Sequence, residues 1–423
     1  MGAEASASIG LMETTMWLLG SICSATAAGF YVQVSHQLGS NDPARARSTL
    51  RQGIMSVLVV SALLGLVSLA VSPFLPTWLG GNSHITPTAS AYFAIVATAL
   101  PIFQFSIFGA GMLRSSGNMV VPSVMSVVMM SLDVVFNFFL IFPTRPVELF
   151  GTQIMMPGMG MGVMGAAIGT VSAELVAASI TMYILCFRSK ELSLRIDTGR
   201  FLPTWGVVKR ALHISLPMGL QQTIMCSAYV MTTIIIAPLG TFAIAANSFG
   251  VIIESLCYMP GYGIADAATT LVGQSMGAGR HELMKRFAWL SVGLGVTVMA
   301  VMGVVMYVGA PVAMAMMTPA EEVRRLGVEV LRIEAFAEPM FAAAIVSYGV
   351  FVGAAKTLVP SIMNLVSIWG VRISLAAMLA PSMGLRGVWI AMCIELCFRG
   401  LIFLVKLKFW NIQTSCKYYG KDQ

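Results

Sequence analysis

Residues 287–312 read FAWLSVGLGVTVMAVMGVVMYVGAPV, a run of 26 residues that contains no Asp, Glu, Lys or Arg. About 20 predominantly apolar residues are enough for a helix to cross the hydrocarbon core of a bilayer, so this run is long enough to span it. Similar stretches recur along nearly the whole chain and predict eleven spans in all. They lie at residues 6–36, 51–79, 90–113, 121–143, 164–187, 211–237, 242–276, 287–312, 328–354, 359–380 and 385–408.

The composition excludes an ordinary soluble domain. Hydrophobic residues make up 57% of the 423 residues and charged residues only 10%, whereas about a quarter of a soluble domain is charged. The apolar runs are longer than the roughly ten-residue strands of an outer-membrane barrel, and a helix satisfies its own backbone hydrogen bonds in lipid. The sequence therefore predicts an all-α integral membrane protein. Because residues 2–5 lead directly into an apolar stretch without a cleavable leader, we expect the helices to direct insertion into a bacterial cytoplasmic (inner) membrane.

The net charge of +7 is explained by membrane orientation. If the loop after the first span is cytoplasmic and the sides alternate, most Lys and Arg residues fall on the cytoplasmic side, as the positive-inside rule requires. No nucleic-acid partner is needed to account for the basic excess. The cytoplasmic set is Arg45, Arg47, Arg51, Arg114, Arg188, Lys190, Arg195, Arg200, Lys209, Arg210, Arg280, Lys285, Arg286, Lys356, Lys406, Lys408, Lys417 and Lys421.

The two halves of the sequence are related by an internal repeat. Matching features recur at a constant offset of 238 in the numbering, and beyond position 165 the offset falls to 222, because the first half carries a longer outer loop around residues 143–163. Prolines and glycines that match at a constant spacing are stronger evidence for a duplication than matching apolar residues, which often coincide by chance. The matches include Gly2 with Gly240, Gly39 with Gly277, Pro101 with Pro339, Val121-Pro122-Ser123 with Val359-Pro360-Ser361, and Gly165 with Gly387.

The repeat predicts two homologous helical bundles. We expect an N-terminal lobe of five spans over residues 1–190 and a C-terminal lobe of six spans over residues 191–423, separated within the basic loop 188–210. The additional span, at 211–237, maps by subtraction onto positions before Met1. The first helix of an ancestral six-plus-six arrangement is therefore expected to be absent, through genuine loss, a misplaced start codon or truncation of the chain.

One long segment resembles a known family of transporters. Residues 260–279 read PGYGIADAATTLVGQSMGAG, and a proline-entered helix that ends in a VGQ-x-x-GAG turn is similar to the second-half signature of the multidrug and toxic compound extrusion (MATE) family. The resemblance extends to Leu113-Arg114 with Gly117-Asn118, and to Trp369-Gly370-Val371-Arg372-Ile373 followed by Gly387-Val388-Trp389. It covers nearly the whole chain apart from the first helix.

This resemblance implies two lobes around a central cleft and a secondary antiporter that works by alternating access. The expected substrates are cationic or amphipathic small molecules, drugs and toxic compounds among them, exported in exchange for Na⁺ or H⁺. It implies no enzymatic activity and no cofactor other than the coupling ion, and we expect a monomer in the lipid bilayer. The family's acidic residue in the first helix has no counterpart here.

Carboxylates inside the predicted spans are candidates for the ion or substrate site, because each costs about 2.5 to 3.5 kcal/mol at mid-bilayer. Glu338 is the first candidate. Pro339 beside it has no N–H to donate, so one backbone carbonyl of the helix has no donor and provides a polar group near the carboxylate. Glu254, near mid-depth with no basic residue nearby, is the second. Asp266 and Glu13 complete the set, while Glu174 and Glu334 lie off-centre and are explained by hydration. A carboxylate that takes either a proton or a cation gives the simplest form of antiport.

Other charged residues are expected to be structural or to act in gating. Glu395 and Arg399 are four residues apart with the acid first, the favoured order for a helical ion pair. Asp133 and Arg372 occupy adjacent equivalent positions in the two halves and are candidates for pairing or gating. Three prolines, Pro101, Pro260 and Pro339, are expected to bend their helices while the lobes rock across the linker 188–210.

Three alternative functions can be set against these residues. A lipid-linked precursor flippase of the same superfamily would have a strongly basic cavity, whereas the arginines in the spans are Arg332, Arg372 and Arg399. An inactive, truncated transporter is the second. An intramembrane enzyme or metal site is disfavoured, since the sequence has no HExxH, no GxSxG and no CxxC, and six of its seven cysteines lie in or next to spans. No metal site is therefore predicted.

Overall fold

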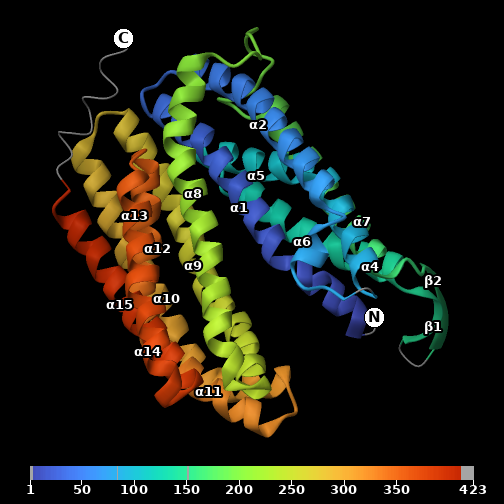
Figure 1. Ribbon diagram of the computed structural model, residues 1–423. Coiled ribbons are helices and arrows are strands. Elements are labelled where there is room, and N and C mark those ends of the chain that lie inside the picture. The colour runs from blue at the N-terminus through green and yellow to red at the C-terminus, as the bar shows by residue number, and fades with distance from the viewer. Residues whose placement is uncertain (1–2, 83, 150–151, 411–423) are drawn as a thin grey trace. The chain divides into compact units, whose positions relative to one another are not determined.

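The computed structural model describes residues 3–82, 84–149 and 152–410 (Figure 1). Across these residues nine helices are long and apolar enough to cross a bilayer one by one, and two pairs of helices, each bent at a short break, bring the possible spans to eleven. This number agrees with the eleven spans expected from the sequence. The prediction of an all-α integral membrane fold is confirmed.

The first half of the chain runs from α1 to the turn that ends α7. Its elements are α1 (Ala3–Gly39), α2 (Pro43–Val71), α3 (Leu75–Trp78), α4 (Thr86–Thr98), α5 (Leu100–Ser115), α6 (Val120–Ile141), the strands β1 (Pro143–Leu149) and β2 (Thr152–Met159), α7 (Gly162–Tyr183) and a π-helical turn, Ile184–Arg188.

The second half begins with a long helix that follows the linker. Its elements are α8 (Trp205–Ile236), a short 3₁₀ turn (Ala237–Leu239), α9 (Thr241–Gly277), α10 (His281–Met317), α11 (Glu321–Glu334), α12 (Glu338–Gly353), α13 (Leu358–Val366), a π-helical turn (Ser367–Ile373), α14 (Ser374–Met383) and α15 (Leu385–Lys408). Of these, α13, the π-helical turn and α14 form one continuous span.

Helix ends repeat at the first offset read from the sequence. Helices α1 and α9 begin and end at equivalent positions, and so do α5 and α12; α10 begins at the equivalent of the start of α2, and α13 at the equivalent of the start of α6. The bent pairs also correspond, with 47° between α4 and α5 and 58° between α11 and α12. The duplication is therefore visible in the helix boundaries as well as in the amino-acid sequence.

Turns with left-handed backbone recur at the same two offsets. A positive φ lets the chain reverse direction at a helix end and is most easily adopted by Gly. At the first offset, Asn41 (58°) corresponds to Gly279 (68°) and Gly117 (84°) to Ala355 (56°), and at the second, Gly162 (58°) corresponds to Gly384 (61°). The turn geometry has been kept even where the residue is not Gly, as at Asn41 and Ala355.

Large apolar side chains point outward and small residues lie at helix crossings. Leu290 is 68% exposed and Val134 69%, as expected for surfaces that face lipid. On α12 a Gly349-x-x-x-Gly353 pair faces α9, where a Cβ at Gly349 would come 2.6 Å from the carbonyl oxygen of Ala265. The hydroxyl of Thr269 donates to the carbonyl of Gly349 across this crossing, at 2.8 Å. Close approach of small residues is the usual basis of helix association in membranes.

The three expected bending prolines lie in two kinds of place. Pro101 and Pro339 are the second residues of α5 and α12, just after each bend. A proline is tolerated there because the first turn needs no N–H donor. Pro260, in contrast, lies inside the continuous helix α9.

A two-stranded hairpin departs from the purely helical expectation in the described part of the chain. Strands β1 and β2 pair antiparallel, with Arg145 opposite Met156, in the segment expected only to be a longer loop. The guanidinium of Arg145 lies 3.9 Å from the ring centroid of Phe142 and thus holds the base of the hairpin against the end of α6. The hairpin accounts for the change of offset between the two parts of the repeat.

The chain divides into two compact units at Gly219–Leu220, inside α8, whereas the sequence places the boundary at 190–191. The reason is that the linker and the start of α8 pack on the first unit. The side-chain amide of Gln33 donates to the carbonyl of Val207 at 3.2 Å, and the side-chain oxygen of Gln52 accepts from both the N–H and the hydroxyl of Thr204 at 2.8 Å.

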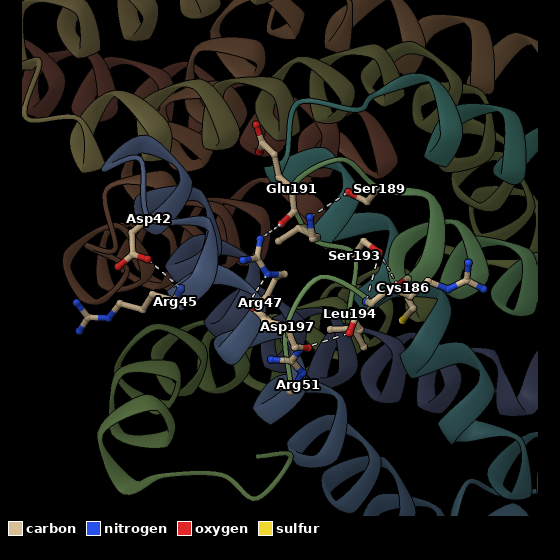
Figure 2. Close-up of polar contacts among 12 residues, drawn as sticks. Asp42, Arg45, Arg47, Arg51, Cys186, Ser189, Glu191, Ser193, Leu194 and Asp197 are labelled. Atoms are coloured by element: carbon tan, nitrogen blue, oxygen red, sulfur yellow. Dashed lines mark hydrogen bonds and ion pairs between the residues drawn. The ribbon is translucent and has the colours of Figure 1, made fainter. Parts of the chain in front are cut away.

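Two buried arginines of α2 hold the linker through one carboxylate. Figure 2 shows Arg47 and Arg51 converging on Asp197: the Arg47 Nε lies 2.7 Å from Oδ2 and the Arg51 Nη2 lies 2.5 Å from Oδ1. Arg51 also donates to the carbonyl of Asp197, and Arg47 to that of Glu191 at 3.0 Å. Hydrogen bonds from Arg51 and then Arg47 hold the pKa of Asp197 below its usual range. We call Arg47, Arg51 and Asp197 the linker clamp.

Candidate functional site

Six charged side chains gather inside the second unit, each within a predicted membrane span. They come from α9, the α11–α12 bend, the π-helical turn and α15. Four are carboxylates and two are guanidinium groups, and the exposed fraction is 7% or less for all but Arg372, whose side chain is 12% exposed. Together they form what we call the acidic cluster: Glu254, Glu334, Glu338, Arg372, Glu395 and Arg399.

Glu395 is the fully paired member of the acidic cluster. Its Oε2 lies 3.1 Å from Arg372 Nη2 and accepts from Arg399 Nη2 at 2.9 Å, and its Oε1 accepts from the hydroxyl of Ser367 at 2.6 Å. The pair of Glu395 with Arg399 expected from the sequence is present, and Arg372 is a second partner from its own unit. Two guanidiniums on one carboxylate leave this part of the cluster with a net positive charge.

Glu334 and Glu338 are the opposite case. They are four residues apart in sequence on either side of the bend, at the last residue of α11 and the first of α12, and are 0% and 1% exposed. None of their four carboxyl oxygens has a hydrogen-bond partner among the residues that the structure describes. Glu254, 7% exposed on α9, is within electrostatic range of both. An ionised carboxylate left in this state would be strongly destabilising.

The charges do not balance within the acidic cluster. Four carboxylates and two guanidiniums would carry a net charge of −2 if all were ionised. The unpartnered carboxyls Glu334 and Glu338 must therefore hold protons, or a cation must lie beside them, for the cluster to be tolerated in an apolar lobe. In the described part of the chain, no three His, Cys, Asp or Glu side chains are arranged to share a metal ion.

The first half of the chain carries no charge at the positions equivalent to five members of the acidic cluster. In the first half, the positions that correspond to the four carboxylates and to Arg399 carry only apolar residues. They are Met16, Val96, Leu100, Ala173 and Ala177, at offsets of 238 for the first three and 222 for the last two. Equivalent helices therefore form in the first half with apolar residues at these positions.

Aromatic rings lie next to the carboxylates. The Tyr258 ring on α9 packs edge-on against Phe341 of α12 with centroids 5.5 Å apart, and against Tyr262 at 5.7 Å. The guanidinium of Arg399 lies 5.5 Å from the centroid of Phe341. Rings beside carboxylates form an environment that favours organic cations through charge and π attraction together.

The remaining sequence candidates lie elsewhere. Asp266 is half-buried on α9, twelve residues and thus about 18 Å along the helix from Glu254, and it lies outside the acidic cluster. Glu13 is exposed on α1, and Asp133 is half-buried on α6, where its Oδ1 has no partner among the described residues. Both belong to the first unit.

One member of the acidic cluster is not among the sequence candidates. The sequence predicts Glu334 to be off-centre and hydrated, yet it is completely buried with no partner in the described residues. The signal is its spacing of four residues from Glu338 with Pro339 directly after, which marks a helix break between two carboxylates. The hydrogen bond from the Ser367 hydroxyl to Glu395 cannot be predicted from the sequence, because it depends on the π-helical turn that carries Ser367.

Comparison with known proteins agrees with this architecture. The MatE family model matches residues 1–139 and 217–378. The chain is 23% identical over 407 residues to a probable multidrug resistance protein NorM of Thermotoga maritima, covering 95% of this chain and 84% of that one. It is 27% identical over 398 residues to a protein of the same name from Chromobacterium violaceum, with 92% and 82% covered.

Solved structures share the fold at low identity. A crystal structure of MATE in the straight conformation superposes with a TM-score of 0.88 at 19% identity, covering 99% of this chain and 90% of that chain. A MOP superfamily transporter from Pyrococcus furiosus gives a TM-score of 0.87 at 18% identity, with 98% and 89% covered. This coverage does not support the prediction that the chain lacks the first helix of the fold. The family match extends over more than half of the sequence, and the chain therefore belongs to the MatE family of membrane transporters, which are not enzymes.

Proposed function

We propose that this protein is a proton-coupled antiporter that exports cationic, amphipathic small molecules, and that Glu338 carries the exchanged proton. The single observation behind this proposal is that both Glu338 oxygens are buried and unpartnered among the described residues, across the α11–α12 bend from the equally unpartnered Glu334. We also expect it to act as a monomer in the bacterial cytoplasmic membrane, where relatives named as multidrug resistance proteins would work.

Exchange follows from competition for these carboxyls. In the absence of substrate, protons neutralise Glu338 and its neighbours and let them remain in an apolar lobe. An organic cation that enters between the carboxylates and the rings of Tyr258 and Phe341 supplies the same neutralisation, so the proton must leave. The reverse exchange resets the site. For export by alternating access, the proton must reach this site from one side of the membrane and the organic cation from the other.

Proton coupling is favoured over sodium coupling by the donors around the site. Na⁺ needs several oxygen ligands at once, whereas neither carboxyl oxygen of Glu338 has a hydrogen-bonding neighbour among the described residues. A proton needs one carboxyl oxygen. Sodium coupling, in which a Na⁺ ion replaces the proton beside Glu338, is the alternative that the experiment must distinguish from proton coupling.

The acidic cluster also argues against a lipid-linked precursor flippase. Such a transporter would need a basic cavity for a pyrophosphate group. Here both guanidiniums of the acidic cluster, Arg372 and Arg399, are paired with Glu395, and three further carboxylates lie nearby. The charge of the cluster suits a cation.

The proposal is tested with purified protein in proteoliposomes loaded with a fluorescent cationic dye. An inward-directed proton gradient should drive dye movement by the unsubstituted protein, and Glu338→Gln should abolish it. Glu322→Gln is the matched control, because Glu322 is exposed in the first turn of α11 and lies outside the acidic cluster. A protein that responds to a sodium gradient at constant pH, or a Glu338→Gln variant that transports normally, would refute the proposal.

A further inference from the structure

A small cavity of about 140 Å³ lies in the second unit where the start of α10 meets the end of α15. It is on the side to which the charge distribution assigns the cytoplasm, since both helix ends are rich in Lys and Arg. Lysines and tryptophans from both elements dominate its walls. The lining residues are Lys285, Ala288, Trp289, Leu407, Lys408 and Trp410.

Trp410 presents a buried donor without an acceptor. Its ring packs against Phe351 of α12 with centroids 5.2 Å apart, so its position is set by the core of the unit. The indole Nε1 is nevertheless buried and has no hydrogen-bond partner among residues 3–82, 84–149 and 152–410. Buried donors in native proteins are nearly always satisfied, and a bound ion or ligand is a usual explanation for an exception.

The two lysines are not neutralised by neighbouring acids. Lys285 Nζ lies 3.9 Å from an oxygen of Glu282, but the two side chains are 53% and 85% exposed, and such a surface pair contributes little. Lys408 makes no ion pair in the part of the chain that the structure describes, and its ammonium lies 5.8 Å from the Phe409 ring centroid. The cavity therefore combines two positive charges with an unsatisfied N–H donor.

The internal repeat identifies the corresponding place in the first unit as an anion site. Subtracting 238 from Lys285 and Trp289 gives Arg47 and Arg51, the two residues of the linker clamp that hold the carboxylate of Asp197. The same turn of the equivalent helix thus binds an anion in one unit. In the other unit, none of the residues that line the cavity is acidic.

We propose that this cavity binds a phosphate group, presented by the headgroup of an anionic phospholipid or as free inorganic phosphate. Two lysines supply the charge, and the Trp410 N–H supplies a directed donor. Basic pockets at the cytoplasmic ends of spans bind anionic headgroups, and Trp is enriched at this depth.

The first test is native mass spectrometry of the delipidated, full-length protein titrated with phosphatidylglycerol or phosphatidylcholine. We expect one saturable phosphatidylglycerol site. Replacing both lysines (Lys285→Gln with Lys408→Gln) should weaken it about 10- to 30-fold, since each basic residue near a headgroup adds roughly a fivefold effect. Trp410→Phe keeps the ring and should weaken binding about threefold to tenfold through the lost donor.

Lys406→Gln is the matched control, because it removes a lysine of the same helix end that does not line the cavity, and binding should then stay within about twofold. A second arm adds inorganic phosphate to protein in phosphatidylcholine nanodiscs and follows tryptophan fluorescence. A saturable response that is lost in the double lysine variant, which keeps both tryptophans of the cavity, identifies free phosphate as the ligand, whereas a response to phosphatidylglycerol alone identifies the lipid. Equal phosphatidylglycerol binding by all variants, with no phosphate response, would overturn the proposal.

Discussion

Glu395 and Glu338 are both buried glutamates of one lobe, yet their surroundings give them opposite roles. Glu395 lies between two guanidiniums and a serine hydroxyl, whereas Glu338 has no partner in the described residues. Removing the charge from Glu395 leaves two buried cations unpaired. Removing the charge from Glu338 removes the energetic cost of a buried carboxylate that has no partner.

Glu395→Gln is therefore expected to destabilise the protein by about 3 to 5 kcal/mol, the usual effect of breaking a buried ion pair from one side. Glu338→Gln should leave stability unchanged or slightly higher while it abolishes transport. Thermal unfolding of the two variants, measured in the same detergent, checks this contrast. Equal loss of stability in both variants would contradict the assignment of Glu395 as structural and Glu338 as the exchanging residue.

The linker clamp makes a prediction about pH. The pKa of Asp197 is lowered by Arg51 and Arg47, so the folded value lies below the unfolded value of about 3.9. Its stabilisation is fully present above the unfolded pKa and is lost as the pH falls through the folded pKa. Asp197→Asn should reduce stability by about 1 to 3 kcal/mol at neutral pH, because two buried guanidiniums lose a partner.

As the pH falls through the folded pKa of Asp197, the Asp197→Asn variant and the unsubstituted protein should converge in stability, because the carboxylate then becomes protonated in the folded chain as it already is in the unfolded one. Unfolding temperatures measured from neutral pH to well below the unfolded pKa of about 3.9 test this. A difference that stays constant over the whole range would mean that Asp197 acts through packing instead of charge.

Ala355 and Gly117 form a natural pair for testing backbone strain. They occupy equivalent turns with φ of 56° and 84°, but only Gly adopts this conformation without a steric penalty of roughly 1 to 2 kcal/mol. Ala355→Gly should raise the free energy of unfolding by about 0.5 to 1 kcal/mol, and Gly117→Ala should lower it by about 1 kcal/mol. Because a Cβ at Gly117 would meet nothing within 4 Å, any loss there reports backbone strain alone.

At the scale of elements, the crossing of α9 and α12 depends on two glycines. A Cβ at Gly353 would collide with the backbone of Thr269, whereas one at Gly293, in the middle of α10, would meet nothing within 4 Å. Gly353→Ala should therefore destabilise the second unit by about 1 to 3 kcal/mol through overpacking. Gly293→Ala should be neutral or stabilising by up to about 1 kcal/mol. Detergent-solubilised unfolding of both variants distinguishes these outcomes.

Elements are the level at which the sequence is most informative. Eleven apolar runs, with Pro101 and Pro339 at the offset shared by the other repeated features, are enough to predict the spans and the duplication, because lipid exposure and turn chemistry act locally. The hairpin of β1 and β2 is not predicted, since this Met-rich and Pro-rich segment lacks the alternation of apolar and polar residues that indicates a strand. The role of Glu334 is missed because burial at a helix break depends on how α11 and α12 bend relative to each other.

The limits at the site have the same origin. Glu338, Glu254, Glu395, Arg372 and Arg399 all stand out in the sequence, because an ionisable residue in an apolar run is conspicuous. Which of them pair can be foreseen only for Glu395 and Arg399, which share one helix. The pairing of Arg372 with Glu395 joins residues 23 apart in sequence, and Asp266 and Glu13 lie away from the acidic cluster because depth and helix face are not fixed by hydropathy.

At the scale of the whole molecule, the linker belongs to the first unit. The sequence suggests rocking of two lobes across residues 188–210, but the linker clamp and the contacts of Gln33 and Gln52 fasten this segment and the start of α8. The division between units falls at Gly219–Leu220, next to Pro217 within α8. Relative movement of the units is therefore expected to be absorbed inside α8.

This predicts that labels on the linker and on the first unit keep a constant separation during transport. Spin labels at Ile196, which is 58% exposed, and at Ser40 should give the same distance distribution with and without substrate and proton gradient. The Asp197→Asn variant should broaden that distribution. A shift of the Ile196–Ser40 distance in the unsubstituted protein would show that the linker itself is the moving joint.

The pairing of Arg372 with Glu395 also has a consequence for biosynthesis. The chain is made from its N-terminus, so the span that carries Arg372 reaches the insertion machinery before α15, which carries Glu395. Until α15 arrives, an arginine that costs roughly 2.5 to 3.5 kcal/mol at mid-bilayer has no counter-ion from this helix. The span 358–383 and α15 would then have to leave the translocon as one hairpin, and the ion pair that stabilises the finished lobe would also set the order of its assembly.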